Sequence, residues 1–221
     1  MNTLADRYHH LKSTLPQHVR LIAVSKTRSV EEIKALYDLG HRAFGENYPQ
    51  ELKEKQPQLP ADIEWHFIGH LQTNKVKLIA PFVHLVHSAD SERLLDELDK
   101  RASSLGRTIS VLVQVHVAQE ETKHGFAPDE LRRAARRWQG CWPNLRVQGL
   151  MAMATMTEDR SKIDAEFAVA SELFEELKAM AVFPPEHLTH LSMGMSGDMD
   201  LAIAHGSTMV RVGTALFGPR Q

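Results

Sequence analysis

The chain has 221 residues, of which 43% are hydrophobic and 24% charged, the ordinary composition of a soluble globular protein. Its 26 basic and 28 acidic side chains nearly cancel, which excludes a global positive field for holding nucleic acid or an anionic membrane. No run of about 18 apolar residues is present, and the charged N-terminal segment lacks the apolar region of a signal peptide, so we expect a cytoplasmic protein without a membrane partner.

The first half of the chain alternates short apolar runs with amphipathic stretches. A helix over about residues 2–14 is expected to lead into the first strand. Four strand–helix pairs follow in order: a strand over 20–24 with a helix over 30–39 that Gly40 closes, a strand over 42–45 with a helix over 48–55, a strand over 64–68 with a helix over 73–80, and a strand over 83–87 with a helix over 90–102.

The second half continues the same alternation. Its four strands are predicted over 109–117, 145–151, 188–192 and 208–212, and the first three are followed by helices over 128–138, 162–180 and 197–205. The run over 109–117 is rich in β-branched residues, and Pro128 stands where proline is tolerated, at the start of a helix.

Eight strands, short connections and no low-complexity linker predict one domain over residues 1–221, an α/β protein of the single-domain (β/α)8 TIM-barrel class with an extra N-terminal helix. The structural alternative is an open doubly wound sheet. The first strand is not followed by the glycine pattern GxGxxG, which weakens a dinucleotide-binding interpretation of that alternative.

Chemistry in such barrels lies at the C-terminal ends of the strands, where the first strand is followed by Lys26. Desolvation at the end of an apolar strand lowers the pKa of a lysine, and only the neutral amine attacks an aldehyde. The alternative is an exposed surface charge, which is the commoner role of a strand-end lysine.

The loops after strands seven and eight form the usual phosphate site of this fold. Here they contain serines and glycines near helix starts, in LSMGMSGDM at 191–199 and in STMVRVGTALFG at 207–218, and such backbone can turn its N–H groups toward an anion. The alternative is ordinary turn chemistry, with Ser196 or Asp198 capping a helix. No metal site is expected, because His66 and His70 are four residues apart but His66 lies in a predicted strand.

Several long motifs resemble the pyridoxal phosphate homeostasis protein family, and the resemblance covers nearly the whole chain. They are AVSKT at 23–27, FGENY at 44–48, WHFIGHLQTNK at 65–75, ETKHGF at 121–126, GLMAM at 149–153, LSMGMSGDM at 191–199 and STMVRVGTALFG at 207–218. The resemblance implies a barrel like the N-terminal domain of alanine racemase, without the second domain of that enzyme.

The resemblance also implies a set of cofactor-binding residues. Pyridoxal 5'-phosphate would be attached to Lys26 as a Schiff base, with Asn47 near its ring and Arg211 facing its pyridine nitrogen. The phosphate would be held by Ser192, by the backbone near Met193 and Gly194, and by Gly213 and Thr214. Arg211 and Gly213 are two residues apart on one strand, so both would point into the barrel.

Members of this family are described as buffering or delivering the cofactor, with effects on amino-acid and keto-acid balance and without clear turnover. A permanently charged guanidinium beside the ring nitrogen disfavours its protonation, and a neutral pyridine is a poorer electron sink. The alternatives are a weak amino-acid racemase, for which Tyr48 is the remaining candidate second base, and a barrel enzyme for a sugar phosphate.

Partners and exchange are expected on the same basis. Apo-enzymes that use the cofactor are the candidate recipients, and an uncovered barrel mouth is compatible with a monomer. Lys123 follows strand five on the same rim, where its ammonium would assist cofactor exchange or form a second, looser site. The alternative for Lys123 is a solvated loop lysine.

Overall fold

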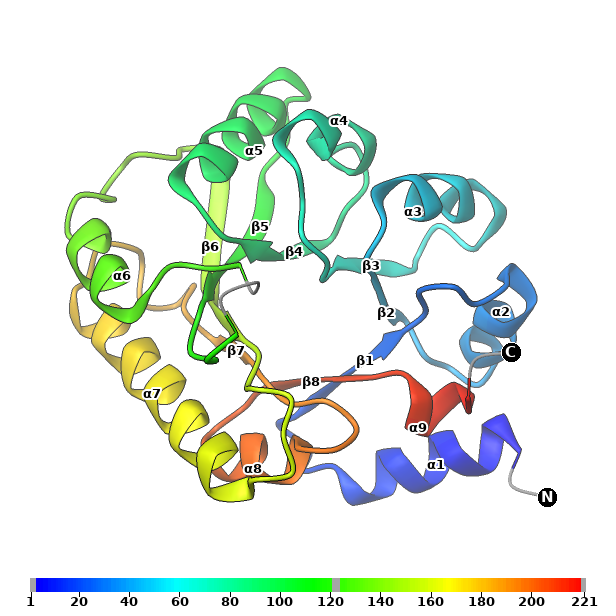
Figure 1. Cartoon of the computed structure of the whole chain (residues 1–221). Helices are drawn as coiled ribbons and strands as arrows, with labels where there is room; N and C mark the ends of the chain where they lie inside the picture. Colours follow the sequence, from blue (N-terminus) through cyan, green and yellow to red (C-terminus); the bar gives the residue numbers. More distant parts are fainter. Residues whose placement is uncertain (1–2, 121–123, 220–221) are drawn as a thin grey trace.

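The computed structural model describes residues 3–120 and 124–219, and within them eight parallel strands close into a barrel (Figure 1). The strands follow one another around the barrel in chain order, and Leu21 of the first stands opposite Val210 of the last. Their bounds are β1 Arg20–Val24, β2 Ala43–Glu46, β3 Glu64–Phe67, β4 Leu85–Ala89, β5 Ile109–Val115, β6 Leu145–Ala152, β7 His190–Ser192 and β8 Met209–Val212. The predicted (β/α)8 barrel is therefore confirmed, because an open sheet would leave β1 and β8 unpaired.

Helices surround the barrel and cover the outer face of the strands (Figure 1). They are α1 Leu4–Thr14, α2 Val30–Asp38, α3 Pro49–Lys55, α4 Val76–Ile79, α5 Glu92–Ser104, α6 Pro128–Ala135, α7 Arg160–Ala179, α8 Met199–Ala204 and α9 Thr214–Phe217, with 3-10 turns η1 Gln56–Gln58 and η2 Thr73–Lys75. Among the described residues, no helix combines the length and the apolar character needed to cross a membrane.

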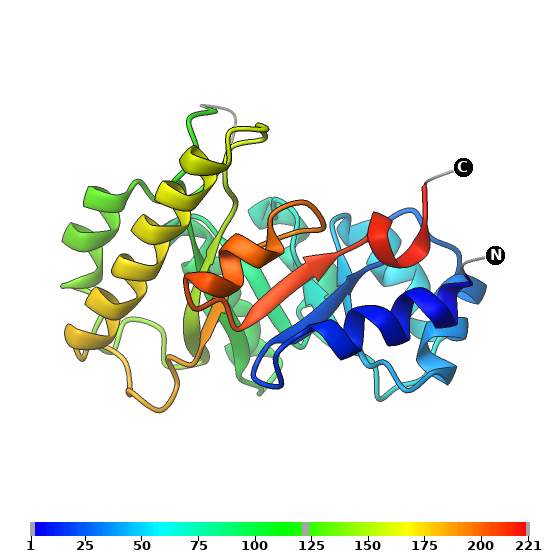
Figure 2. The same ribbon diagram turned by 90° about the horizontal axis from the view of Figure 1, so that it is seen from below.

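The extra N-terminal helix, α1, packs beside the last helix of the chain. It begins with a capping box in which Thr3 and Asp6 satisfy each other's backbone N–H groups, and it buries Tyr8 and Leu11. The Arg7 Nε donates to the Leu216 carbonyl oxygen in α9 at 2.7 Å. Figure 2 shows α1 running alongside α9, so the first helix packs against the helix that follows β8 at the expected phosphate site.

The strand residues divide into two layers because successive side chains point to opposite faces. Those pointing outward, such as Trp65 and Phe67, join the large apolar cluster under the helices. Those pointing inward form a smaller apolar cluster, made of Ile22, Ala43, Leu85, Leu112, Met151 and Met209. His66, His87 and Ser192 are fully buried, and Arg211 is nearly so, at 4% exposed. This barrel therefore has a partly polar interior.

Most element boundaries differ from the predictions by one or two residues. The fourth strand begins at Leu85 instead of residue 83, because the Val83 N–H closes the turn after α4 by donating to the Ile79 carbonyl oxygen at 2.9 Å. The helix predicted over 73–80 is split into η2 and α4. The short helix α9 was not predicted, since four residues after a strand carry too little periodicity to be recognised.

Candidate functional site

A cavity of about 280 Å³ opens where β1 and β8 end. Its lining residues come from the ends of these two strands and from the loop after β7: Val24, Lys26, Arg28, Met195, Ser196, Gly197, Arg211, Gly213 and Thr214. Four of the eight residues expected from the sequence therefore share one cavity, although they come from opposite ends of the chain. Three of the lining side chains are cationic, so the cavity favours an anionic ligand.

Lys26 is the second residue after the end of β1. The preceding residue, Ser25, is fully buried and donates its N–H to the Gly45 carbonyl oxygen at 2.9 Å. The following residue, Thr27, is exposed and has φ of +63°, a left-handed conformation that is unusual for a β-branched residue. Such a conformation costs on the order of 1–3 kcal/mol and persists only where the surroundings impose it.

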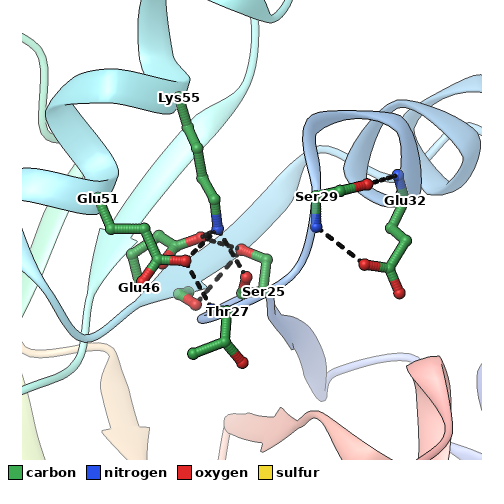
Figure 3. A network of polar contacts seen from close by, with 8 residues as sticks. Ser25, Thr27, Ser29, Glu32, Glu46, Glu51 and Lys55 are labelled. Carbon is green, nitrogen blue, oxygen red and sulfur yellow. Dashed lines mark hydrogen bonds and ion pairs between the residues drawn. The ribbon is translucent and has the colours of Figure 1, made fainter. Parts of the chain in front are cut away.

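A charged cluster made of Glu46, Glu51 and Lys55 contacts this segment (Figure 3). The Lys55 Nζ donates to Glu46 Oε1 at 2.8 Å, to Glu51 Oε1 at 2.6 Å and to the Ser25 carbonyl oxygen at 2.8 Å. The same Glu51 oxygen accepts the Thr27 N–H at 2.6 Å. Burial raises the pKa of Glu46, and the charge of Lys55 opposes that rise.

Glu51 and Lys55 were not predicted as site residues. Their spacing of four residues on α3 predicts a helical ion pair, but such pairs usually lie in solvent and do not indicate a functional site. Only the fold shows that Lys55 is 8% exposed and reaches the β1 end, 30 residues earlier in the chain.

Arg211 points into the barrel, as strand alternation predicts, and is held there by backbone and side-chain oxygens. Its Nη1 donates to the Ser192 carbonyl oxygen and to Ser192 Oγ, each at 2.8 Å, and its Nη2 donates to the Ala152 carbonyl oxygen at 3.0 Å. Burial lowers the pKa of Arg211 to about 10, so the guanidinium stays charged at neutral pH.

A hydrogen-bonded chain continues from Arg211 through the barrel interior. Ser192 Oγ is 2.9 Å from His87 Nδ1, and His87 Nε2 is 2.9 Å from His66 Nδ1. Burial lowers the pKa of both histidines well below the ordinary value, with neighbouring positive charge acting in the same direction. Both imidazoles are therefore neutral, and the positive charge of this hydrogen-bonded series of side chains lies on Arg211.

The residues expected to hold a phosphate divide into two groups. Gly213 and Thr214 line the cavity, at the start of α9. The Ser192 hydroxyl lies between Arg211 and His87, and the Met193 N–H donates to the Met209 carbonyl oxygen at 3.1 Å. Gly194 has φ of +90°, which favours glycine, and its carbonyl oxygen accepts the Arg211 N–H at 2.9 Å.

The β7 loop instead turns its next three residues, Met195, Ser196 and Gly197, toward the cavity. Asp198 is the N-cap residue of α8, the position that the alternative interpretation gave it. Its carboxylate makes no capping bond to α8 and accepts the Met195 N–H at 2.6 Å, which shapes the loop that carries these three residues.

Two further residues expected at the site do not line this cavity. Asn47 is half-buried next to Gly69, where any side chain at residue 69 would approach the Asn47 carbonyl oxygen to 2.3 Å. Tyr48, the candidate second base, is 53% exposed at the start of α3. Lys123 lies outside the described residues.

A second cavity of about 450 Å³ adjoins the first, since both are lined by Met195 and Gly197. Its other lining residues come mainly from the loop after β6, where Met156 is 93% exposed. Two groups of side chains in the described ranges have donor atoms close enough to share a metal ion, namely Glu64 with His66 and His84, and His70 with Asp90 and His124. In the first group, Arg20 already pairs with Glu64.

Comparison with known proteins extends this picture. The family model described as alanine racemase, N-terminal domain, matches residues 1–221. A pyridoxal phosphate homeostasis protein of Pasteurella multocida (strain Pm70) is 42% identical over 207 residues, which cover 91% of this chain and 87% of that protein. One of Helicobacter pylori (strain J99) is 37% identical over 221 residues, covering 98% and 96%.

Solved structures agree with the sequence relatives. PipY of Synechococcus elongatus PCC7942, with pyridoxal phosphate bound, is 38% identical and superposes with a TM-score of 0.88 over 98% of this chain and 100% of that one. Its structure without the cofactor gives a TM-score of 0.92. An alanine racemase of Clostridium difficile 630 shares the fold alone, with a TM-score of 0.76 at 15% identity, and this chain spans 57% of its length.

Proposed function

Since this chain belongs to the alanine racemase N-terminal domain family, and within it to the pyridoxal phosphate homeostasis proteins, we propose that it binds pyridoxal 5'-phosphate at Lys26 and takes part in the intracellular homeostasis of that cofactor. The observation that carries the proposal is the cavity in which Lys26, Arg211, Gly213 and Thr214 meet. PipY, a relative of known structure, supports the choice of ligand because it has been solved with this cofactor.

The described residues fit the ligand by their chemistry. An aldehyde requires an amine, which Lys26 supplies, and a phosphate requires cations and N–H or O–H donors, which Arg28, Ser196, Gly197, Gly213 and Thr214 place around the same cavity. Arg28 is 9% exposed and donates to the Gly218 carbonyl oxygen, so its guanidinium is held in place before a ligand arrives. We retain Ser192, Met193, Gly194 and Asn47 in the proposed binding set, and we add the three cavity-lining residues of the β7 loop.

Each residue has a distinct task in this proposal. Lys26 would supply the amine that condenses with the aldehyde carbon, with loss of water, and so would hold the ligand covalently. Gly213 leaves room for the phosphate, and the Thr214 hydroxyl donates to it. When bound, the cofactor supplies an electron sink, and its strength depends on the proton at the pyridine nitrogen.

Arg211 is proposed to donate to that ring nitrogen and so to keep it unprotonated. Its bonds to Ser192 and Ala152 use three of the five guanidinium N–H donors. A charged guanidinium at this position opposes a second positive charge on the ring. This weakens the electron sink, which favours storage and delivery of the cofactor over amino-acid turnover.

We further propose that the protein acts as one domain and as a monomer in the cytoplasm, and that it delivers the cofactor to apo-enzymes made there. Lys123 is proposed to assist this exchange. The transfer rate to an apo-enzyme should then fall in Lys123→Ala, whereas an equal rate would leave Lys123 as a solvated loop lysine.

The proposal for Lys26 is tested by borohydride reduction of the protein loaded with pyridoxal 5'-phosphate. Reduction should fix the label on the peptide that contains Lys26, and Lys26→Ala should lose the visible absorption band of the attached cofactor. Lys53→Ala is a matched control, because Lys53 is an exposed lysine on α3. Labelling mainly at another lysine would contradict the assignment.

A further inference from the structure

The backbone around Lys26 is anchored at three successive points (Figure 3). Before it, the Ser25 carbonyl oxygen accepts from Lys55 Nζ at 2.8 Å. After it, the Thr27 N–H donates to Glu51 Oε1 at 2.6 Å. Two residues further on, Ser29 begins α2 with a capping box in which its hydroxyl and the Glu32 carboxylate satisfy each other's backbone N–H groups, at 3.2 and 2.8 Å.

The first two anchors belong to the charged cluster of Glu46, Glu51 and Lys55, which is more buried than an ordinary helix ion pair. Glu46 is fully buried and the Lys55 side chain is 8% exposed, while Glu51 is 23% exposed. Removing ions from water is costly, and the mutual attraction of a buried pair often only offsets that cost. A contribution to stability therefore does not explain why these charges are buried. The bonds from the cluster to the backbone on both sides of Lys26 indicate that it fixes the position of that segment.

The third feature is the conformation of Thr27, whose φ of +63° is imposed on a β-branched residue. The Glu51 carboxylate accepts the N–H of this same residue, so it holds the strained turn from outside the strand. A change of Thr27 to an ordinary extended conformation would rotate the peptide that joins it to Lys26. The direction in which the Lys26 side chain leaves the strand would change with it.

On the basis of the proposed function, we propose that Glu51 and Lys55, supported by Glu46, are positioning residues that aim the Lys26 amine at the aldehyde of pyridoxal 5'-phosphate. They act through the backbone of residues 25–27 and do not line the cavity themselves. Orientation of this kind affects the rate of a covalent step strongly, since misplacing a reacting group by about 1 Å can lower the rate about 100-fold.

The inference is tested by measuring how fast the cofactor becomes attached at increasing pyridoxal 5'-phosphate concentration. Such a series separates the first, non-covalent binding step from the maximum rate of attachment. Glu51→Ala and Lys55→Met should lower the maximum rate by about 10- to 100-fold, and should change the non-covalent dissociation constant by less than about threefold. Glu51→Gln keeps an oxygen that can accept from both Thr27 and Lys55, so it should restore most of the rate.

Two controls make the result specific. Glu54→Ala and Lys53→Met change exposed residues on the same helix and should attach the cofactor like the wild type. Pyridoxal, which lacks the phosphate, should show the same rate ratio between Glu51→Ala and wild type, because the defect lies in the amine and not in phosphate binding. Thermal unfolding of each variant shows whether the protein is folded. If Lys55→Met does not fold, the test is carried out with Glu51→Ala, because Glu51 is the more exposed partner.

The outcomes distinguish this inference from the proposed function. If folded Glu51→Ala attaches the cofactor at the wild-type maximum rate, the positioning role is wrong while Lys26 remains the attachment site. A loss that appears only in the non-covalent step would also overturn it. If the wild type and Glu54→Ala both fail to become labelled at Lys26, the proposed function itself fails.

Discussion

Replacing Ser192 by alanine separates two roles for this residue, as a link in the buried hydrogen-bonded chain and as a phosphate ligand. In the cofactor-free protein its hydroxyl lies 2.8 Å from Arg211 Nη1 and 2.9 Å from His87 Nδ1, with Ser192 fully buried. A buried hydrogen bond to a charged group contributes about 1.5–3 kcal/mol, and one between neutral groups about 0.5–1.5 kcal/mol. Ser192→Ala should therefore lower the free energy of unfolding by about 2–4.5 kcal/mol.

Urea denaturation of the cofactor-free protein, followed by far-ultraviolet circular dichroism, measures this loss. Ser104→Ala is the matched control, because Ser104 is exposed and its hydroxyl donates to the Arg101 carbonyl oxygen one turn earlier in its own helix. This substitution should change stability by less than about 0.5 kcal/mol. If Ser192→Ala is as stable as the control but binds pyridoxal 5'-phosphate more weakly, the stabilising role of the Ser192 hydrogen bonds is refuted. The hydroxyl would then be assigned to phosphate binding.

Three other changes test the site and the interior. Gly213→Val should weaken cofactor retention by more than about tenfold in equilibrium dialysis. The thermal midpoint should change little, because a Cβ at Gly213 would stand at an ordinary 3.4 Å from Val24. Unchanged retention would show that Gly213 is not part of the site. Arg211→Glu should favour a protonated ring nitrogen and speed α-proton exchange of an added amino acid, measured per bound cofactor by NMR; an unchanged spectrum and rate would mean that Arg211 does not contact the ring. Burial lowers the pKa of His41 from 6.5 to about 4, so the native state holds it neutral while the unfolded state takes up a proton. The contribution of His41 to the free energy of unfolding is complete above about pH 6.5 and decreases by about 3 kcal/mol as the pH falls toward 4. In urea titrations at a series of pH values, the free energy of unfolding should therefore depend less steeply on pH in His41→Asn than in the wild type.

Local patterns in the chain were sufficient for the architecture. Eight apolar runs alternate with amphipathic stretches, and the parallel strands that this order requires have few ways to close over so short a chain. Boundaries were harder to predict, as at β4, because a turn residue such as Val83 is as apolar as the strand it precedes. Hydrophobic periodicity reports burial, and it does not show which buried residue has its N–H bonded within a turn.

The site was predictable in part, for a physical reason that particular residues show. Strand ends meet at one mouth of a barrel, so the positions of Lys26 and Gly213 after β1 and β8 were enough to expect them together. The loop after β7 was harder, because its path depends on bonds between residues far apart in the chain. The Met193 N–H is bonded to Met209, and the cavity wall is consequently formed by Met195, Ser196 and Gly197.

The sequence by itself determined the barrel, the lysine at the end of its first strand and the glycine- and serine-rich loops that follow β7 and β8, because each depends on short-range pattern or on order along the chain. Only the tertiary structure decided which side chains contact one another across it. Lys55 reaches the Ser25 carbonyl oxygen from a helix 30 residues away, and Ser192 lies between His87 and Arg211 inside the barrel. Hydrogen bonds of a few ångströms depend on how strands and helices pack, and no local pattern encodes that distance.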